Sequence, residues 1–234
     1  MEHAISWNRL TGQLDTRCQN QLNKYGVWVD LALEQKLNEP GIKVEYIYFP
    51  TCGVIALMMQ QANDKPLAVA LVGNEGMLGI APVLGVQFVP YSAIVLAEGV
   101  ALRIPVQHLH ALKLTNQHFG ICLDRYIAVR NAQFAQASVC NGLHNVQQRL
   151  ARILLVYSDR LRTLTFSMTQ ELLATLLGVR RAGINKAANE LQRLHIVYYS
   201  RGEIEILNVS ALMQMSCHCY ETEKKIYENI LFLH

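Results

Sequence analysis

Residues 169–207, TQELLATLLGVRRAGINKAANELQRLHIVYYSRGEIEIL, combine two short helical patterns with one alternating pattern. Thr169 is a favourable N-cap, and leucines at helical spacing follow it as far as Gly178. A second helical pattern begins after this glycine, with Ile184 and Leu191 among its apolar positions. The last part then alternates on both sides of a glycine turn, which predicts a hairpin. Two helices, a turn and a hairpin predict a winged helix-turn-helix.

The second of these helices has a distinct polar side. Opposite its apolar positions it carries Arg181, Asn185, Lys186 and Asn189, and Arg180 immediately precedes it. The major groove of duplex DNA admits one helix, where Arg or Lys can hydrogen-bond guanine and Asn can pair with adenine. A solvated basic face is the alternative interpretation. The adjoining hairpin and the N-cap favour a recognition helix that enters the groove.

The distribution of charge supports the same interpretation. The chain of 234 residues has 21 Lys and Arg against 18 Asp and Glu, which is only mildly basic. Residues 143–216, however, carry nine basic and five acidic side chains, so the excess lies in one C-terminal segment. Such local asymmetry is typical of a protein that binds a polyanion.

Several classes of protein are disfavoured. The N-terminal stretch has no basic segment followed by an apolar one, so no secretory signal is expected. The most apolar region, residues 67–106, is interrupted by polar residues, glycines and prolines, so no membrane span is expected. Six cysteines without such a signal indicate a reducing, cytoplasmic location. GxSxG, P-loop and HExxH motifs are absent, and we expect no enzyme.

The N-terminal half predicts a helix followed by a β domain. Residues 8–37 have helical spacing, and the turn sequence NEPG at 38–41 ends them. Short β-branched runs with turn residues between them follow, at 44–48, 54–59, 67–73, 92–99 and 100–105. This pattern predicts an antiparallel sandwich or jelly roll. The chain is therefore of the α+β class.

A long helix is predicted over 119–141. The apolar residues along one side include Leu123, Ile127 and Phe134. Packing on the chain's own core and a dimer seam are both compatible with this pattern. Gly142 marks a break, and Asn145 with Gln148 forms a capping box that begins the next helix.

The chain resembles the Crp/Fnr family of transcriptional regulators over nearly its whole length. The motifs that carry the resemblance are VGNEGMLG (72–79), CNGLHNVQQRLARILL (140–155), TQELLATLLGVRRAGI (169–184), YSRGEIEIL (199–207) and CHCY (217–220). The resemblance implies a jelly-roll sensory domain over 1–118, similar to cyclic-nucleotide-binding domains, a dimerisation helix over 119–142 and a winged helix-turn-helix with a C-terminal tail over 143–234. It implies a homodimer on a roughly palindromic operator in double-stranded DNA, with RNA polymerase as a partner.

Within the recognition helix, the resemblance implies that Arg181, Ala182 and Lys186 face the groove. Ala182 stands where many members have a glutamate that accepts a hydrogen bond from cytosine, so the operator of better-known relatives does not carry over. A methyl group at this place can contact thymine. Thr169 and Gln170 are expected to contact phosphates, and Arg201 to make a wing contact.

The sensory domain departs from the family's nucleotide-binding pattern. The degenerate pocket corresponds to Gly79, Ile80, Tyr91 and Ser92. Ile80 stands where cyclic-nucleotide-binding relatives have a ribose-binding glutamate, and Tyr91 where they have a phosphate-binding arginine. A buried phosphate without a counter-charge is very costly, so we expect no response to cyclic AMP. An uncharged small ligand would suit such a pocket better.

One group of residues is a candidate for binding a metal ion. Two distant N-terminal thiols do not make an iron-sulfur site, and no cofactor is firmly predicted. Cys140, His144, Cys217 and Cys219 would supply three sulfurs and one nitrogen to a zinc ion if their segments meet. Buried thiols in packing contacts and a redox pair are the alternatives. A second functional hypothesis is therefore a small-molecule or metal and redox sensor whose basic C-terminal domain docks another protein.

Overall fold

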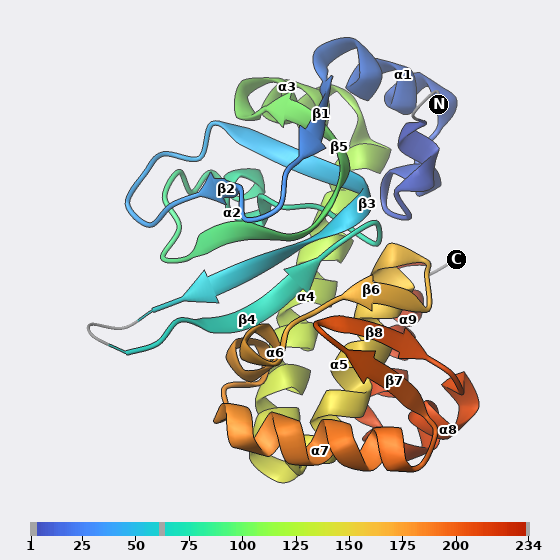
Figure 1. Cartoon of the computed structure of the whole chain (residues 1–234). Helices are drawn as coiled ribbons and strands as arrows, with labels where there is room; N and C mark the ends of the chain where they lie inside the picture. The colour runs from blue at the N-terminus through green and yellow to red at the C-terminus, as the bar shows by residue number, and fades with distance from the viewer. Residues whose placement is uncertain (1–3, 61–63, 233–234) are drawn as a thin grey trace.

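The computed structural model describes residues 4–60 and 64–232, arranged as a β domain above a helical C-terminal part (Figure 1). The β domain begins with short helices and contains one antiparallel sheet. Its elements are η1 (Ile5–Trp7), η2 (Thr11–Gln13), α1 (Thr16–Tyr25), β1 (Val27–Leu31), β2 (Lys36–Asn38), β3 (Tyr46–Met59), β4 (Leu67–Val72), α2 (Ile80–Val83) and β5 (Ser92–Pro105). Helices α3 (Val106–Thr115) and α4 (Gln117–Leu143) follow.

The sheet is built around two long strands. Its order is β1-β5-β3-β4, and β2 also pairs with β5. The β3–β5 register runs from Tyr46 opposite Pro105 to Met58 opposite Ser92, with shifts near Cys52. At these shifts Gly53 has a φ of 88°, and a Cβ on Gly99 would lie 2.2 Å from the carbonyl oxygen of Cys52. Only glycine therefore allows the two strands to bend together here.

The expected helix over residues 8–37 is only partly present. Helix α1 occupies its middle, with the Asp15 side chain accepting from the Cys18 backbone N–H at 2.6 Å. Residues 27–31, however, form β1 and pair with β5. The prediction was wrong for this part because hydrogen bonds from a strand far along the chain outweighed the local spacing. The two runs at 92–105 are likewise one strand, β5.

The C-terminal part contains the expected helix-turn-helix and hairpin. It consists of α5 (Val146–Leu161), β6 (Thr165–Ser167), α6 (Gln170–Leu177), α7 (Arg181–Arg193), β7 (Val197–Ser200), β8 (Glu203–Ile206), α8 (Val209–Met215) and α9 (Cys219–Leu231). The capping box predicted at Asn145 and Gln148 is present at the start of α5. The fold class is therefore confirmed as an antiparallel β-sheet domain, a long helix and a helix-turn-helix with a small hairpin.

The two parts share a hydrophobic core. Val54, Met58 and Leu71 of the sheet pack in the same buried cluster as Leu150 and Tyr157 of α5. The Tyr157 hydroxyl also donates to the Leu96 carbonyl oxygen at 3.1 Å. The helix-turn-helix therefore rests on the sheet. Of the helices in residues 4–60 and 64–232, none has both the length and the apolar character that crossing a membrane requires.

Candidate nucleic-acid interface

The helix-turn-helix is shaped by caps and a glycine turn. The Thr169 side chain accepts from the Leu172 backbone N–H at 3.1 Å, which confirms it as the N-cap of α6. Gly178 ends α6 in the left-handed region, at a φ of 62°, where a residue with a Cβ would be strained. Leu173 of α6 and Leu191 of α7 are both fully buried between the helices. The turn and this packing fix the direction in which α7 leaves α6.

Helix α7 has one buried and one exposed side. Its buried residues are Ile184, Ala187, Ala188 and Leu191. Its exposed residues include Arg181, Ala182, Asn185, Lys186 and Asn189, and the N-cap residue Arg180 is also exposed. In Figure 1 this helix lies along the lower edge of the molecule, remote from the sheet. The structure thus brings the predicted groove-facing residues together on an accessible helix.

The cations of this face are not neutralised by the chain itself. Across residues 4–60 and 64–232, none of the ion pairs involves Arg180, Arg181 or Lys186. Arg193, on the last turn of the same helix, differs because it pairs with Glu190 at 2.7 Å. The N-terminal half of α7 is therefore available to an external anion, whereas its C-terminal end is already paired.

The hairpin lies beside the start of α6. Arg201 and Gly202 form its tip, with φ values of 50° and 86°. The Gly202 carbonyl oxygen accepts from the Met168 backbone N–H at 2.6 Å, and a Cβ on this glycine would lie 3.6 Å from the Thr169 Cγ2. Arg201 and Thr169 are exposed, whereas Gln170 is half-buried. The proposed phosphate contacts therefore lie close to the exposed wing residue.

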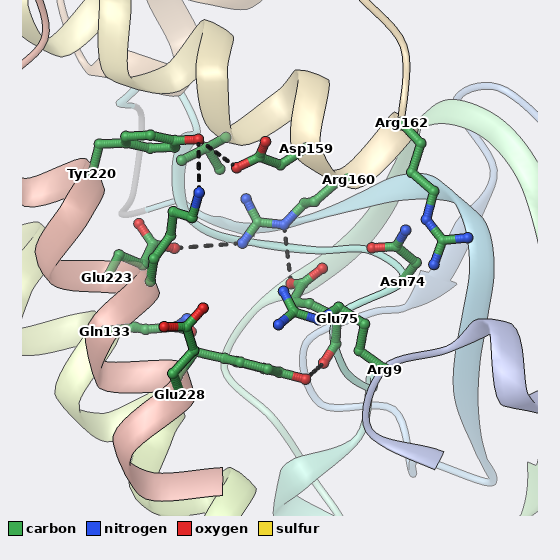
Figure 2. Close-up of a pocket in the computed structure, with 13 residues that line it drawn as sticks. Arg9, Asn74, Glu75, Gln133, Asp159, Arg160, Arg162, Tyr220, Glu223 and Glu228 are labelled. Atoms are coloured by element: carbon green, nitrogen blue, oxygen red, sulfur yellow. Dashed lines mark hydrogen bonds and ion pairs between the residues drawn. The ribbon is translucent and has the colours of Figure 1, made fainter. Parts of the chain in front are cut away.

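A buried ionic network joins the β domain to the C-terminal part (Figure 2). Arg160 of α5 pairs through Nε with Glu75 at 3.0 Å and through Nη2 with Glu223 of α9 at 3.5 Å. Glu223 also accepts from Arg152 at 2.5 Å. The Tyr227 hydroxyl donates to the Glu75 backbone carbonyl at 2.5 Å. One guanidinium group thus links the turn after β4 to the last helix.

Electrostatics in this network favour the charged forms. Burial alone raises the pKa of the Glu223 carboxyl, but the guanidinium groups of Arg152 and Arg160 outweigh it and lower that pKa below its usual value. Burial lowers the pKa of Arg160, but Glu75 and Glu223 outweigh this effect and raise it. Each charge in the network therefore depends on its partners.

Four arginines lie inside the molecule, which the sequence pattern did not predict. They are Arg130, Arg149, Arg152 and Arg160, and they line a cavity of about 300 Å³ between β4, α4, α5 and α6. The Arg130 Nη1 donates to the Leu71 carbonyl at 3.1 Å, and the Arg149 Nη2 donates to the Leu177 carbonyl. Helical spacing gave no clear signal for them, because the buried residues of α5 occupy almost every position from Arg149 to Arg160.

This cavity changes the expectation of an uncharged ligand. Arg130 Nη2, Arg149 Nε and Arg152 Nε are buried and have no hydrogen-bond partner within the described residues. The sequence pattern predicts no cation at the position of the phosphate-binding arginine, where Tyr91 stands. Helices α4 and α5 supply those cations instead.

The four positions of the degenerate pocket lie on different elements and pack in different clusters. Gly79 adopts a φ of 111° before α2, and Ile80 packs against the core cluster beneath α1 and α3. Tyr91 packs against a different cluster, together with Phe134 of α4, and Ser92 begins β5. Ile80 and Tyr91 therefore serve packing, each in its own part of the β domain.

The residues expected in a dimer seam lie in different environments. Leu123 is only 1% exposed and packs within the chain's own core, so its assignment to a seam is corrected. Ile127 and Phe134 are half-buried against core clusters. The prediction failed for Leu123 because an apolar helix face packs equally well against the chain's own core and against a second copy.

The four candidate metal ligands do meet. Cys140 lies in the last turn of α4 and His144 caps that helix, while Cys217 and Cys219 flank the start of α9. Their ligand atoms all lie within 4.8 Å of one another. The three thiols are buried and the imidazole is half-buried. The structure therefore assembles the constellation that the sequence left open.

One part of the chain matches a known domain family. Residues 148–215 match the Crp-like helix-turn-helix domain family. Among curated protein sequences, none matches the chain.

The whole fold is similar to solved structures at low sequence identity. FixK2 from Bradyrhizobium japonicum superposes with a TM-score of 0.70 and 13% identity, covering 82% of this chain and 98% of that one. CLP from Xanthomonas campestris, described as a c-di-GMP responsive global regulator, gives 0.67 and 13%, covering 82% and 99%. A transcriptional regulator of the CRP family from Thermus thermophilus gives 0.66 and 14%, covering 80% and 96%. At this identity the similarity shows a common fold.

Proposed function

We propose that this chain is a DNA-binding transcriptional regulator of the Crp/Fnr type rather than an enzyme, and that it acts in the cytoplasm as a homodimer on a roughly palindromic operator. The observation that carries the proposal is the exposed, unpaired basic face of α7 within a Crp-like helix-turn-helix domain. Because each copy supplies one such helix, two copies related by a two-fold axis would read two half-sites in successive major grooves. RNA polymerase is the partner that the family resemblance implies.

The groove-facing residues divide into two roles. Arg181, Asn185 and Lys186 lie on the first two turns of α7, where a recognition helix meets base edges, so we assign them to sequence reading. Ala182 between them offers a methyl group to thymine. The phosphate contacts are assigned to Arg180, Thr169, Gln170 and the wing residue Arg201, with Asn189 further along the helix. These contacts position the protein without reading sequence.

Dimerisation is supported by the exposed side of α4. The exposed residues along this side, at alternating spacings of three and four, are Ile121, Asp124, Ala128, Asn131, Ala135 and Ser138. This is the spacing at which two helices wind around each other, and the small side chains allow their backbones to approach closely. The seam proposed here is therefore displaced from the one expected around Leu123. It would set the distance between the two recognition helices.

We infer that cyclic AMP is not the effector. The family resemblance puts Ile80 and Tyr91 at the places of the ribose-binding glutamate and the phosphate-binding arginine, and both side chains pack against core clusters. Isothermal titration with cyclic AMP is expected to show no binding, and its addition to leave operator affinity unchanged. A measurable enthalpy of binding would overturn this inference.

Binding to duplex DNA at graded salt tests the proposed function. A preferred sequence is first selected from a randomised duplex pool, and affinity is then measured by fluorescence anisotropy. We expect the logarithm of the binding constant to fall linearly with that of the salt concentration, because phosphate contacts release counterions. Arg181→Ala should lose about 1–3 kcal/mol on the selected sequence and much less on unrelated DNA.

Arg193→Ala is the matched control for this experiment. Arg193 lies on the same helix and is exposed, but it already pairs with Glu190. Its removal should leave operator affinity nearly unchanged. Salt-independent binding would refute the DNA-binding proposal, and equal losses in the two variants would refute the assignment of Arg181 to base reading.

A further inference from the structure

The Cys140, His144, Cys217 and Cys219 side chains converge from two segments far apart in the chain. The Cys140 Sγ lies 3.5 Å from the Cys217 Sγ, a pair separated by 77 positions. The Cys219 Sγ lies 3.4 Å from the His144 Nδ1, across 75 positions. Two contacts between ligand-type atoms therefore connect the end of α4 to the start of α9.

The spacing of these atoms fits a four-coordinate metal. Zinc binds thiolate sulfur at about 2.3 Å and imidazole nitrogen at about 2.0–2.1 Å, so sulfurs on a regular tetrahedron lie roughly 3.8 Å apart. The two measured separations, 3.5 Å and 3.4 Å, are close to this value. All four ligand atoms lie within 4.8 Å of one another, so small side-chain rotations suffice to complete a tetrahedron.

Packing alone does not account for the cluster. Cys140, Cys217 and Cys219 form a buried group of their own that contains no other buried apolar residue. Cys18 and Cys122, in contrast, are buried within a large apolar cluster, where a thiol serves as a small hydrophobic side chain. Three thiols and an imidazole that gather apart from the apolar core have the composition of a metal site.

A hydrogen-bond donor is already present in the surroundings of the cluster. Gln136, one helical turn before Cys140, donates through Nε2 to the Cys219 Sγ at 3.0 Å. Donors of this kind orient the ligands of metal sites from the surrounding layer of side chains. The cluster also lies at the first turn of α9, where the helix dipole favours negative charge.

We propose that Cys140, His144, Cys217 and Cys219 bind one zinc ion per chain in a tetrahedral site with three sulfur ligands and one nitrogen ligand. A set of four protein ligands leaves no open position, so the site is structural. Soft thiolates together with imidazole favour zinc over the hard cations magnesium and calcium.

At this location a metal ion would connect the joint between α4 and α5 to the start of α9. Helix α4 ends at Leu143 and α5 begins at Val146, so His144 and Asn145 alone form the joint between them. Zinc would tie this joint, through His144 and Cys140, to the start of α9. Because α5 leads into the helix-turn-helix, the ion would fix the angle between α4 and α7. This consequence for operator affinity rests on the proposed function, whereas the metal site itself does not.

The first test uses the full chain, purified under reducing conditions and then freed of metal with a chelator. Titration with Co²⁺ alone should give thiolate-to-cobalt charge transfer and the intense ligand-field bands of a tetrahedral ion, reaching a plateau at one equivalent per chain. Added Zn²⁺ should abolish both signals. A featureless titration, or a spectrum typical of six oxygen ligands, would overturn the proposal without requiring any variant.

Substitutions then identify the ligands. Cys217→Ser and His144→Ala should each lose the tetrahedral cobalt spectrum or shift it, and each should retain less than one zinc by elemental analysis. Gln136→Leu keeps the ligands but removes the donor to sulfur, so it should retain the stoichiometry and bind roughly 10–100-fold more weakly. Cys122→Ser and Cys52→Ser, a buried and an exposed thiol outside the cluster, are the matched controls and should bind metal like the parent.

Mass spectrometry separates the metal site from a redox pair. A chain that contains a Cys140–Cys217 disulfide after gentle reducing purification and takes up no metal would overturn the proposal. If zinc binds but its removal leaves operator affinity unchanged, the ion does not control the angle between α4 and α7. The metal site itself then stands. If zinc binds and no duplex is bound in either state, it is the DNA-binding proposal that fails.

Discussion

Arginines on α7 and arginines around Arg160 belong to the same C-terminal part of the chain but have opposite surroundings. Arg180 and Arg181 are exposed and form no ion pair within the described residues. Arg160 is 6% exposed and pairs with two carboxylates from distant elements. The comparison shows that a local excess of positive charge contains two populations, one directed at an external anion and the other holding the chain together.

The two populations differ in what their removal costs. An exposed cation keeps its water shell, so its loss mainly affects whatever it binds outside the chain. A buried cation holds its partners in the charged form, so its loss leaves uncompensated carboxylates in a low-dielectric environment. Substitutions in the two regions should therefore change different measured quantities.

The largest effect is expected at the centre of the buried network. Arg160→Met should lower the free energy of unfolding by about 3–5 kcal/mol, because Glu75 and Glu223 lose a shared partner. Urea denaturation followed by circular dichroism measures this loss. Combining it with Glu75→Gln should recover part of the stability, since one of the two carboxylates is then no longer charged. A loss under about 1 kcal/mol for Arg160→Met would mean that the network is solvated rather than buried.

The next effect concerns binding and leaves stability unchanged. Lys186→Ala should weaken operator binding by about 1–3 kcal/mol if its ammonium reads a guanine. Its free energy of unfolding should stay within about 0.5 kcal/mol of the parent, as for other exposed substitutions. Fluorescence anisotropy measures the operator affinity of the variant, and urea denaturation measures its free energy of unfolding. A variant that loses stability and affinity together would remove the distinction between the two regions.

Acid should weaken the buried network only below the pH at which an ordinary glutamate titrates, because the pKa of Glu223 is lowered. The pKa of Glu223 is lowered in the folded chain, so its stabilising effect is complete above the unfolded value of about 4.3. That effect disappears as the pH falls through the lower, folded pKa. Glu223→Gln should therefore show a weaker acid dependence of the urea midpoint than the parent between neutral pH and about pH 3. Identical dependences would show that Glu223 is not held in its charged form.

The smallest effect is expected for the surface pair on α7. Arg193→Ala removes an exposed ion pair with Glu190 at a spacing of three residues and should leave the thermal unfolding midpoint nearly unchanged. Because the pair is exposed, added salt should reduce this difference further. Thermal unfolding at low and high salt provides the comparison. A larger, salt-independent loss would place this arginine with the buried group.

The parts of the fold that could be predicted are those governed by local signals. The Thr169 cap, the glycine after α6 and the Asn145 capping box each act within a few residues, so their patterns identified the helices correctly. Residues 27–31 were misassigned because their strand state depends on pairing with β5, about seventy positions later. Such pairing leaves no trace in local spacing.

The candidate sites show the same division. The outer face of α7 was predictable because an amphipathic helix exposes its polar side by periodicity alone. The burial of Arg130, Arg149 and Arg160 was not, because a charged residue is assigned to the surface unless its partner is known. Their partners lie on β4, α6 and the turn that carries Glu75. The cysteine cluster was visible as a set of residue types, but only the tertiary structure shows that its members meet.

The bond between Tyr227 and the Glu75 carbonyl has a consequence for the order in which the molecule assembles. Its two ends are separated by 152 positions along the chain. During synthesis the β domain leaves the ribosome first, and domains generally fold as units in that order. Glu75 and Arg160 can pair once α5 has been translated, whereas Glu223 and Tyr227 join them only after α9 has docked. A nascent chain would therefore lack the second half of this network until residues near Tyr227 had been translated.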